Sequence, residues 1–203
     1  MNKEETYLPQ GTILKNRYEV ISVIGTGGFG ITYRAVDQLL DCYVAIKEFF
    51  PQKWASRENG KSRRVAFYQD DESKKIVEEC LHNFRHEAKI LEKIKDVPYI
   101  ARLKDYFPEN ETEYIVLSLV QGETLSDYVK KRSGKLPAAE ALSYIQYTFD
   151  TLKYLHGMGI IHRDISPGNL MISEDQVLYL IDFGSATSFD GKEEFQSEQV
   201  FEH

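Results

Sequence analysis

The stretch that decides the fold is residues 160–170, which read I-I-H-R-D-I-S-P-G-N-L. Asp164 within it has two interpretations. It is either a charged residue in a surface turn, or the base that accepts a hydroxyl proton during phosphoryl transfer. A short string cannot separate these two, so the decision rests on what else the chain carries, and at what spacing.

A glycine-rich loop, G-T-G-G-F-G, occupies residues 25–30. Glycines let a backbone turn tightly and approach phosphate oxygens without an intervening side chain. The pattern after the loop continues as a strand, whereas a dinucleotide-binding fold requires a helix there. Taken alone, the loop is best explained as a simple glycine-rich hairpin.

Lys47 ends the string V-A-I-K at residues 44–47, on a predicted strand. A lysine on an inward-facing strand position is costly to bury unless it is paired. Glu87 is its natural partner, because apolar residues of one helix face flank it. The alternative is an edge-strand lysine that points into water, and the string alone does not exclude it.

Two further motifs follow Asp164. Asn169 lies five residues after it, and Asp182-Phe183-Gly184 comes later in the chain. Asp and Asn oxygens are hard ligands suited to Mg²⁺, which binds through one or two carboxylates plus phosphates. Each string alone could arise by chance. All four in this order favour a phosphoryl-transfer site and a catalytic role for Asp164.

Period-two apolar patterns predict strands at residues 18–24, 31–36, 43–47, 103–107 and 114–119. Helical spacing predicts a helix over residues 74–95 and another over 137–156, and Thr124 with Asp127 predicts the start of a short one. The second helix has an apolar face that we expect to be buried, formed by Leu142, Ile145, Phe149, Leu152 and Leu155. Residues 51–73, called the insert below, show no steady period and predict an exposed, solvated extension.

The composition limits the classes of partner and the cell compartment that we expect for this chain. The net charge of -7 argues against a general affinity for nucleic acid, and two cysteines fit a reducing cytoplasm. The chain contains no apolar stretch that could span a bilayer. We therefore expect a cytoplasmic protein without a membrane segment in this chain.

The four motifs together resemble those of a eukaryotic-like (Hanks-type) serine/threonine protein kinase. K-E-F-F-P at residues 47–51 and I-S-P at 165–167 resemble the bacterial type, and the resemblance covers about residues 18–188. It implies an α+β, two-lobed protein-kinase-like fold, with a complete N-lobe of antiparallel sheet plus helix and a partial helical C-lobe. The implied boundaries are residues 1–117 for the N-lobe, 118–122 for the hinge and 123–203 for the C-lobe.

The resemblance also implies ATP and Mg²⁺ as cofactors and a protein as substrate. Lys47 would hold the α- and β-phosphates of ATP and pair with Glu87. Mg²⁺ would be held by Asp182 and Asn169. Asp164 would accept the proton of the substrate hydroxyl or orient that hydroxyl. Nucleotide contacts would come from Ile24, Gly25, Gly27, Gly30, Thr32, Ala45, Lys47, Leu117, Ser118, Val120 and Met171.

Two features depart from the family pattern. Ser166 stands where a lysine is usual, which predicts weaker charge stabilisation at the γ-phosphate. The sequence ends at His203 without an A-P-E string, so we expect a chain that stops within the activation segment, with impaired transfer and a partner covering its exposed C-lobe surface. Two alternatives remain at this point: a nucleotide-binding pseudokinase, or a small-molecule phosphotransferase similar to those that act on aminoglycosides.

Overall fold

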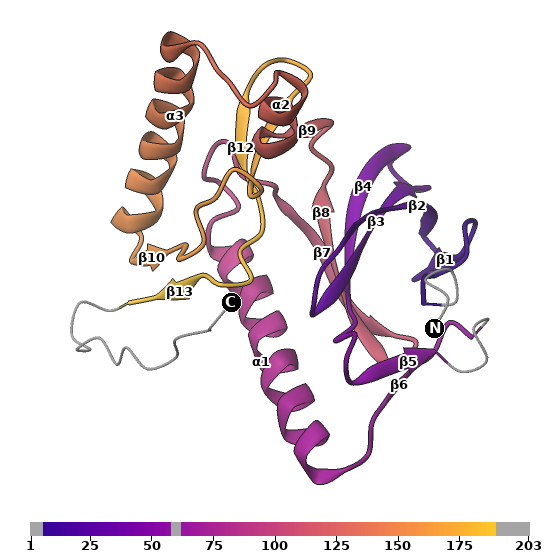
Figure 1. Cartoon of the computed structure of the whole chain (residues 1–203). Coiled ribbons are helices and arrows are strands. Elements are labelled where there is room, and N and C mark those ends of the chain that lie inside the picture. The colour runs from indigo at the N-terminus through magenta and orange to yellow at the C-terminus, as the bar shows by residue number, and fades with distance from the viewer. Residues whose placement is uncertain (1–5, 58–61, 190–203) are drawn as a thin grey trace.

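The computed structural model describes residues 6–57 and 62–189 (Figure 1). Its largest element is a six-stranded antiparallel sheet with the strand order β1-β2-β3-β4-β8-β7. The strands are β1 (Ile13–Leu14), β2 (Tyr18–Thr26), β3 (Gly30–Asp37), β4 (Cys42–Phe49), β7 (Leu103–Glu109) and β8 (Thr112–Ser118). All five strands predicted from the sequence are therefore confirmed, with small shifts at their ends.

Alternation along the strands separates the two faces of this sheet. On β3, Ile31, Tyr33 and Ala35 are fully buried, while the residues between them are only half-buried. Successive side chains of a strand point to opposite faces, so one face forms a closed core and the other stays partly accessible. The accessible face carries Thr32 and Lys47, which are directly paired across β3 and β4.

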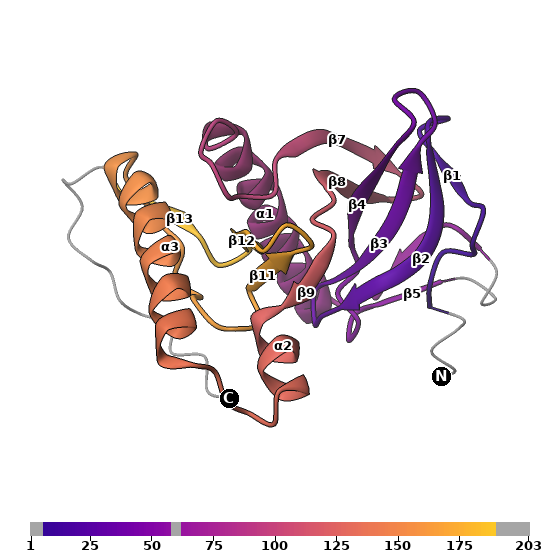
Figure 2. The same ribbon diagram turned by 90° about the horizontal axis from the view of Figure 1, so that it is seen from above.

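Helix α1 (Asp71–Lys93) confirms the first predicted helix and starts slightly earlier. The Asp70 side chain accepts a hydrogen bond from the Ser73 N–H, which satisfies a donor at the helix start. The buried face of α1 contains Phe84, Ala88 and Leu91. In Figure 2, α1 lies between the sheet and the helical part of the molecule.

The helical part begins with β9 (Gly122–Thr124) and α2 (Leu125–Lys131), and Thr124 caps α2 as predicted by accepting a hydrogen bond from the Asp127 N–H. The remaining elements are α3 (Ala138–Gly157), β10 (Ile160–Ile161), β11 (Leu170–Ser173), β12 (Leu178–Leu180) and β13 (Thr187–Ser188). Strands β12, β11 and β9 form one small sheet, and β10 pairs with β13. None of the helices in the described ranges is long and apolar enough to cross a membrane.

The predicted buried face of α3 is largely wrong. Leu142, Ile145 and Phe149 are 65%, 61% and 69% exposed, and of the five predicted residues only Leu155 is fully buried. The buried residues of α3 are Tyr144, Thr151 and Leu155. The apolar pattern was correctly identified, but no other described element packs against most of it.

The prediction of an exposed insert is wrong for its hairpin, although Lys53, Arg63 and Arg64 are exposed as expected. Its hairpin, β5 (Ala55–Arg57) and β6 (Val65–Phe67), packs onto the N-lobe, with Ala55, Arg57 and Val65 buried. The Phe67 ring lies 5.8 Å from that of Phe49, and the Val65 N–H donates to the carbonyl of Asn110. The described part of the insert is thus packed against the N-lobe, and residues 58–61 lie outside the described ranges.

Candidate functional site

The candidate site is centred on Lys47. Its Nζ lies 2.8 Å from Oε2 of Glu87 on α1 and 3.0 Å from Oδ1 of Asp182. These partners are 40 and 135 residues away along the chain, so the fold brings the V-A-I-K lysine, the glutamate of α1 and the D-F-G aspartate together. The predicted pairing of Lys47 with Glu87 is confirmed, and the edge-strand alternative is excluded.

Charge and burial oppose each other at this cluster. Burial alone would lower the pKa of Lys47, but the negative charges of Glu87 and Asp182 outweigh it and raise the pKa. Burial raises the pKa of Glu87, and the Lys47 charge opposes that rise. Burial would also raise the pKa of Asp182, but Lys47 more than compensates and lowers it. The cluster therefore favours the charged form of the Lys47 ammonium, which lies between the buried Glu87 carboxyl and the more exposed Asp182 carboxylate.

The loop of residues 162–169 is held in a defined shape. Asn169 donates its Nδ2 to the Asp164 carboxylate at 2.8 Å and to the Asp164 carbonyl at 3.0 Å. The buried His162 ring packs against Phe183, with ring centroids 4.8 Å apart, and burial lowers the pKa of His162. The exposed Asp164 carboxylate is thus fixed by its neighbours while its outer side faces solvent.

Backbone strain marks the same region. Arg163 and Asp182 both have positive φ values, 65° and 61°, a conformation that non-glycine residues rarely adopt. The Arg163 Nε donates to the Ser185 carbonyl at 2.6 Å, and the Gly184 N–H donates to Asp182 Oδ1. The first contact connects the loop of residues 162–169 to Ser185, directly after Asp182-Phe183-Gly184, and the second fixes the shape of that segment.

The residues predicted to contact the nucleotide lie mostly on one face of the sheet. Gly25 pairs with Thr32, Thr32 with Lys47, and Ala45 with Leu117, and paired residues of an antiparallel sheet point to the same side. Thr32, Ala45, Leu117, Ser118, Val120 and Met171 are half-buried, and Ile24 is exposed. The roles of these residues in nucleotide binding stay predictions.

Gly30 is required at its position for a steric reason. A Cβ at residue 30 would lie 2.8 Å from the backbone carbonyl oxygen of Glu48, which is too close for any side chain. Gly27 has no such restriction, since a Cβ there would meet nothing within 4 Å. The structure thus explains one glycine of the loop by close backbone packing rather than by the phosphates.

Asp182 and Asn169 have the donor chemistry that a magnesium ion needs. The hydrogen bonds described above use Oδ1 of Asp182 and the amide nitrogen of Asn169. This leaves the second carboxylate oxygen of Asp182 and the amide oxygen of Asn169 as the atoms that would hold the ion. Hard oxygen donors of this kind fit Mg²⁺.

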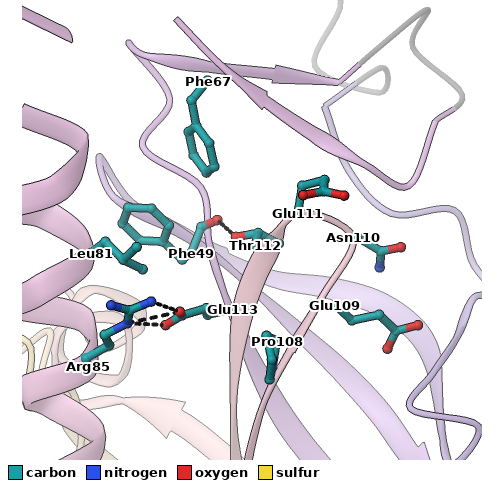
Figure 3. Close-up of a pocket in the computed structure, with 10 residues that line it drawn as sticks. All are labelled: Phe49, Phe67, Leu81, Arg85, Pro108, Glu109, Asn110, Glu111, Thr112 and Glu113. Atoms are coloured by element: carbon teal, nitrogen blue, oxygen red, sulfur yellow. Dashed lines mark hydrogen bonds and ion pairs between the residues drawn. The ribbon is translucent and has the colours of Figure 1, made fainter. Parts of the chain in front are cut away.

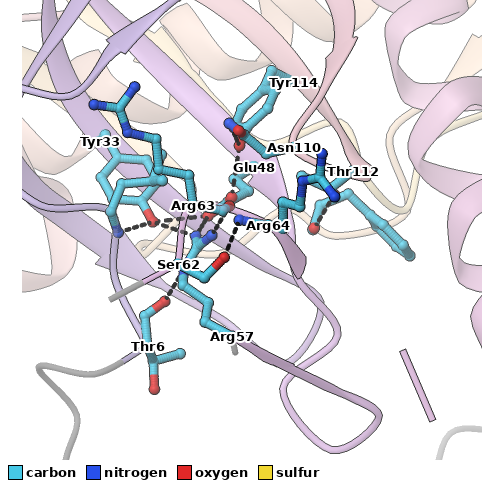
Figure 4. Close-up of polar contacts among 12 residues, drawn as sticks. Thr6, Tyr33, Glu48, Arg57, Ser62, Arg63, Arg64, Asn110, Thr112 and Tyr114 are labelled. Atoms are coloured by element: carbon cyan, nitrogen blue, oxygen red, sulfur yellow. Dashed lines mark hydrogen bonds and ion pairs between the residues drawn. The ribbon is translucent and has the colours of Figure 1, made fainter. Parts of the chain in front are cut away.

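Sequence reasoning missed a second charged cluster on the opposite face of β4 (Figure 4). Glu48, fully buried, accepts hydrogen bonds from Tyr33 at 2.8 Å, from Tyr114 at 2.9 Å and from Arg57 at 2.5 Å. Arg57 also donates to the Thr6 and Arg63 carbonyls. The sequence did carry one signal for this cluster: the charged Glu48 follows the apolar residues Val44 and Ile46 on the same strand.

A hollow of about 440 Å³ lies on another side of α1 (Figure 3). It is lined by Phe49, Phe67, Leu81, Arg85, Pro108, Glu109, Asn110, Glu111, Thr112 and Glu113. An ion pair between Arg85 and Glu113 borders it, and none of its lining residues is a predicted site residue. The hollow is therefore separate from the cluster around Lys47.

Comparison with known proteins agrees with this geometry. The family model described as the protein kinase domain matches residues 18–202. A probable serine/threonine-protein kinase of Clostridium acetobutylicum is 31% identical over 176 residues, which cover 87% of this chain and 23% of that protein. The serine/threonine-protein kinase PknA of Mycobacterium tuberculosis is 32% identical, with 89% of this chain and 38% of that protein covered.

PrkC of Bacillus subtilis, a serine/threonine-protein kinase, is 32% identical over 88% of this chain and 24% of its own length. A solved structure titled "PpkA-294 apo form" superposes with a TM-score of 0.80 at 32% identity, covering 89% of this chain and 62% of that one. The chain thus spans between about a quarter and two fifths of the length of these three curated relatives.

Proposed function

The chain belongs to the protein kinase family, and from that premise we propose that it transfers the γ-phosphate of ATP to a serine or threonine hydroxyl of a protein. The observation that carries this proposal is the position of Lys47, between Glu87 and Asp182. An ammonium group held by two carboxylates at the edge of solvent is suited to meeting the negative charge of a phosphate. The reaction belongs in the cytoplasm, where ATP is available.

In this proposal the nucleotide lies between the N-lobe and the C-lobe, with residues 118–122 as the hinge. The Ser118 carbonyl and the Val120 N–H would bind the adenine, and Thr32, Ala45 and Met171 would pack against it. The half-buried state of these side chains supports this placement. The proposed N-lobe, residues 1–117, and C-lobe, residues 123–203, then contribute one wall each.

Each polar residue has a distinct part in the proposed reaction. Lys47 binds and orients phosphate oxygens, and Glu87 keeps Lys47 in place. Asp164 orients the substrate hydroxyl and receives its proton, while Asn169 fixes the Asp164 carboxylate at 2.8 Å. Asn169 and Asp182 would hold magnesium, which would supply positive charge to neutralise the phosphates. The uncharged Ser166 leaves more of that neutralisation to Lys47 and the ion.

The test is transfer of labelled γ-phosphate from ATP to a mixed protein substrate, with wild type and Asp164→Asn compared. The asparagine keeps the size of the side chain but cannot accept the proton, so we expect a rate at least about 100-fold lower. Nucleotide binding should be retained, which calorimetry can check. Equal transfer rates for the two proteins would contradict the role assigned to Asp164.

A further inference from the structure

The tip of the glycine-rich loop is held by the segment that immediately follows β4. The Phe50 N–H donates to the Phe29 carbonyl at 3.1 Å, and the Gln52 N–H donates to the Gly28 carbonyl at 3.0 Å. The Gln52 side-chain amide Nε2 donates to the Gly27 carbonyl at 2.8 Å. Three successive loop carbonyls are therefore bonded by one short segment.

These hydrogen bonds orient the peptide groups of the loop. The C=O and the following N–H of a trans peptide point in opposite directions, and no cis peptide bond occurs in the described residues. With the carbonyls of residues 27–29 turned toward Phe50 and Gln52, the N–H groups of Gly28 and Phe29 point away from that segment. A row of backbone N–H groups directed to one side is suited to binding an anion.

The segment that carries Gln52 is fixed to the protein core. Phe50 and Pro51 are buried, and the Trp54 N–H donates to the Pro51 carbonyl at 2.8 Å. Further along, Arg57 forms the sealed ion pair with Glu48, whose side chains are 1% and 0% exposed. The backbone on both sides of Gln52 is therefore attached to the packed core, although the Gln52 side chain itself is exposed.

We propose that Gln52 is a positioning residue for the phosphates of the nucleotide. It contacts no reacting atom; it holds the glycine-rich loop in the conformation that presents its N–H groups to the phosphates. This inference rests on the proposed function, since it requires ATP to bind beneath the loop. It also gives the insert a role in nucleotide binding, through the residues that anchor Gln52 to the N-lobe.

The experiment compares ATP and adenosine affinity by calorimetry in wild type and Gln52→Ala. Loss of one exposed neutral hydrogen bond should weaken Mg-ATP binding about three- to tenfold. Adenosine has no phosphates, so its affinity should not change. Gln52→Glu keeps the length of the side chain but removes the donor and should lose ATP affinity at least as much. Lys53→Ala, at the exposed neighbour, is the matched control and should bind both ligands as wild type does.

Amide hydrogen exchange in the nucleotide-free protein tests the loop directly. We expect faster exchange at residues 27–30 in Gln52→Ala than in wild type or Lys53→Ala. Unchanged ATP affinity in Gln52→Ala, or an equal loss for ATP and adenosine, would overturn the inference and leave the proposed function standing. A wild-type protein that binds neither ligand would instead overturn the proposed function, and the phosphate-positioning role with it.

Discussion

The two faces of strand β4 carry two charged clusters in different surroundings: Lys47 with Glu87 and Asp182, and Glu48 with Arg57. Lys47 points to the accessible face, where its side chain is 22% exposed and its partner Asp182 is 49% exposed. Glu48, the next residue, points to the core, where it and Arg57 are almost completely buried. The side chains of these two adjacent residues thus lie on opposite faces of the strand, one near solvent and one in the core.

The difference separates a binding site from a structural contact. Charges at the edge of solvent can exchange partners, so Lys47 can turn from Asp182 to a phosphate at little cost. Charges buried in the core cannot exchange partners, because removing either partner leaves the other as an uncompensated buried charge. The comparison predicts that variants on the core face lose stability, and that variants on the accessible face lose ligand binding first.

The largest stability effect should come from Arg57→Met. The change leaves Glu48 buried without its cationic partner, and we expect a loss of about 3–5 kcal/mol in the free energy of unfolding, measured by urea denaturation. Arg64→Met, at an exposed arginine of the same insert, is the control and should change stability by less than about 0.5 kcal/mol. A loss below about 1 kcal/mol for Arg57→Met would show that the Arg57–Glu48 ion pair is not shielded from water.

The double variant Glu48→Met with Arg57→Met removes both charges. It should recover about 2 kcal/mol relative to Arg57→Met alone, because no unpaired charge remains in the core. Recovery should be incomplete, since the hydroxyl groups of Tyr33 and Tyr114 lose their acceptor. A double variant as unstable as the sum of its single changes would argue against direct coupling of Glu48 and Arg57.

A smaller loss is expected for Tyr114→Phe. Its hydroxyl donates to Glu48 at 2.9 Å, and a buried hydrogen bond to a charged group contributes about 1.5–2 kcal/mol. Tyr43→Phe, at an exposed tyrosine on the neighbouring strand β4, is the matched control and should be neutral. Equal unfolding free energies for Tyr114→Phe and wild type would mean that Glu48 does not need this donor.

The smallest stability effect, and the one that depends on pH, should come from Lys47→Met. Burial raises the pKa of Glu87, and the variant removes the charge that opposes this rise. A carboxyl with a raised pKa in the folded state destabilises that state only once pH rises above the unfolded value, about 4.3. The variant should match wild type near about pH 4 and be less stable by about 1 kcal/mol near about pH 7. A gap that shrinks with rising pH would contradict this account of Glu87.

The sequence predicted the accessible face of β4 well, because its residues belong to motifs with fixed chemistry and order. Lys47, Glu87 and Asp182 were named in advance and lie together. The core face was missed for a physical reason. Arg57 lies in a segment with no apolar period, so nothing in its neighbourhood indicated that its charge would be compensated by a buried Glu48.

Helix α3 shows a second limit of prediction from sequence. Its period correctly identified an apolar face, with Leu142 and Phe149 upon it, but periodicity does not say what covers such a face. In the described residues only the side with Tyr144, Thr151 and Leu155 is packed. Burial depends on which other elements are present, and that information lies outside the helix itself.

The most direct test of the central claim is calorimetric titration of the folded chain with ATP, with and without magnesium. Wild type should bind ATP more tightly with magnesium, and Lys47→Met should lose at least about 30-fold in affinity because the phosphate partner is gone. The far-ultraviolet circular dichroism of both proteins should agree, which ensures that folded proteins are compared. Wild type that binds no ATP, or Lys47→Met that binds it equally well, would contradict the claim that Lys47, Glu87 and Asp182 form a phosphate-binding site.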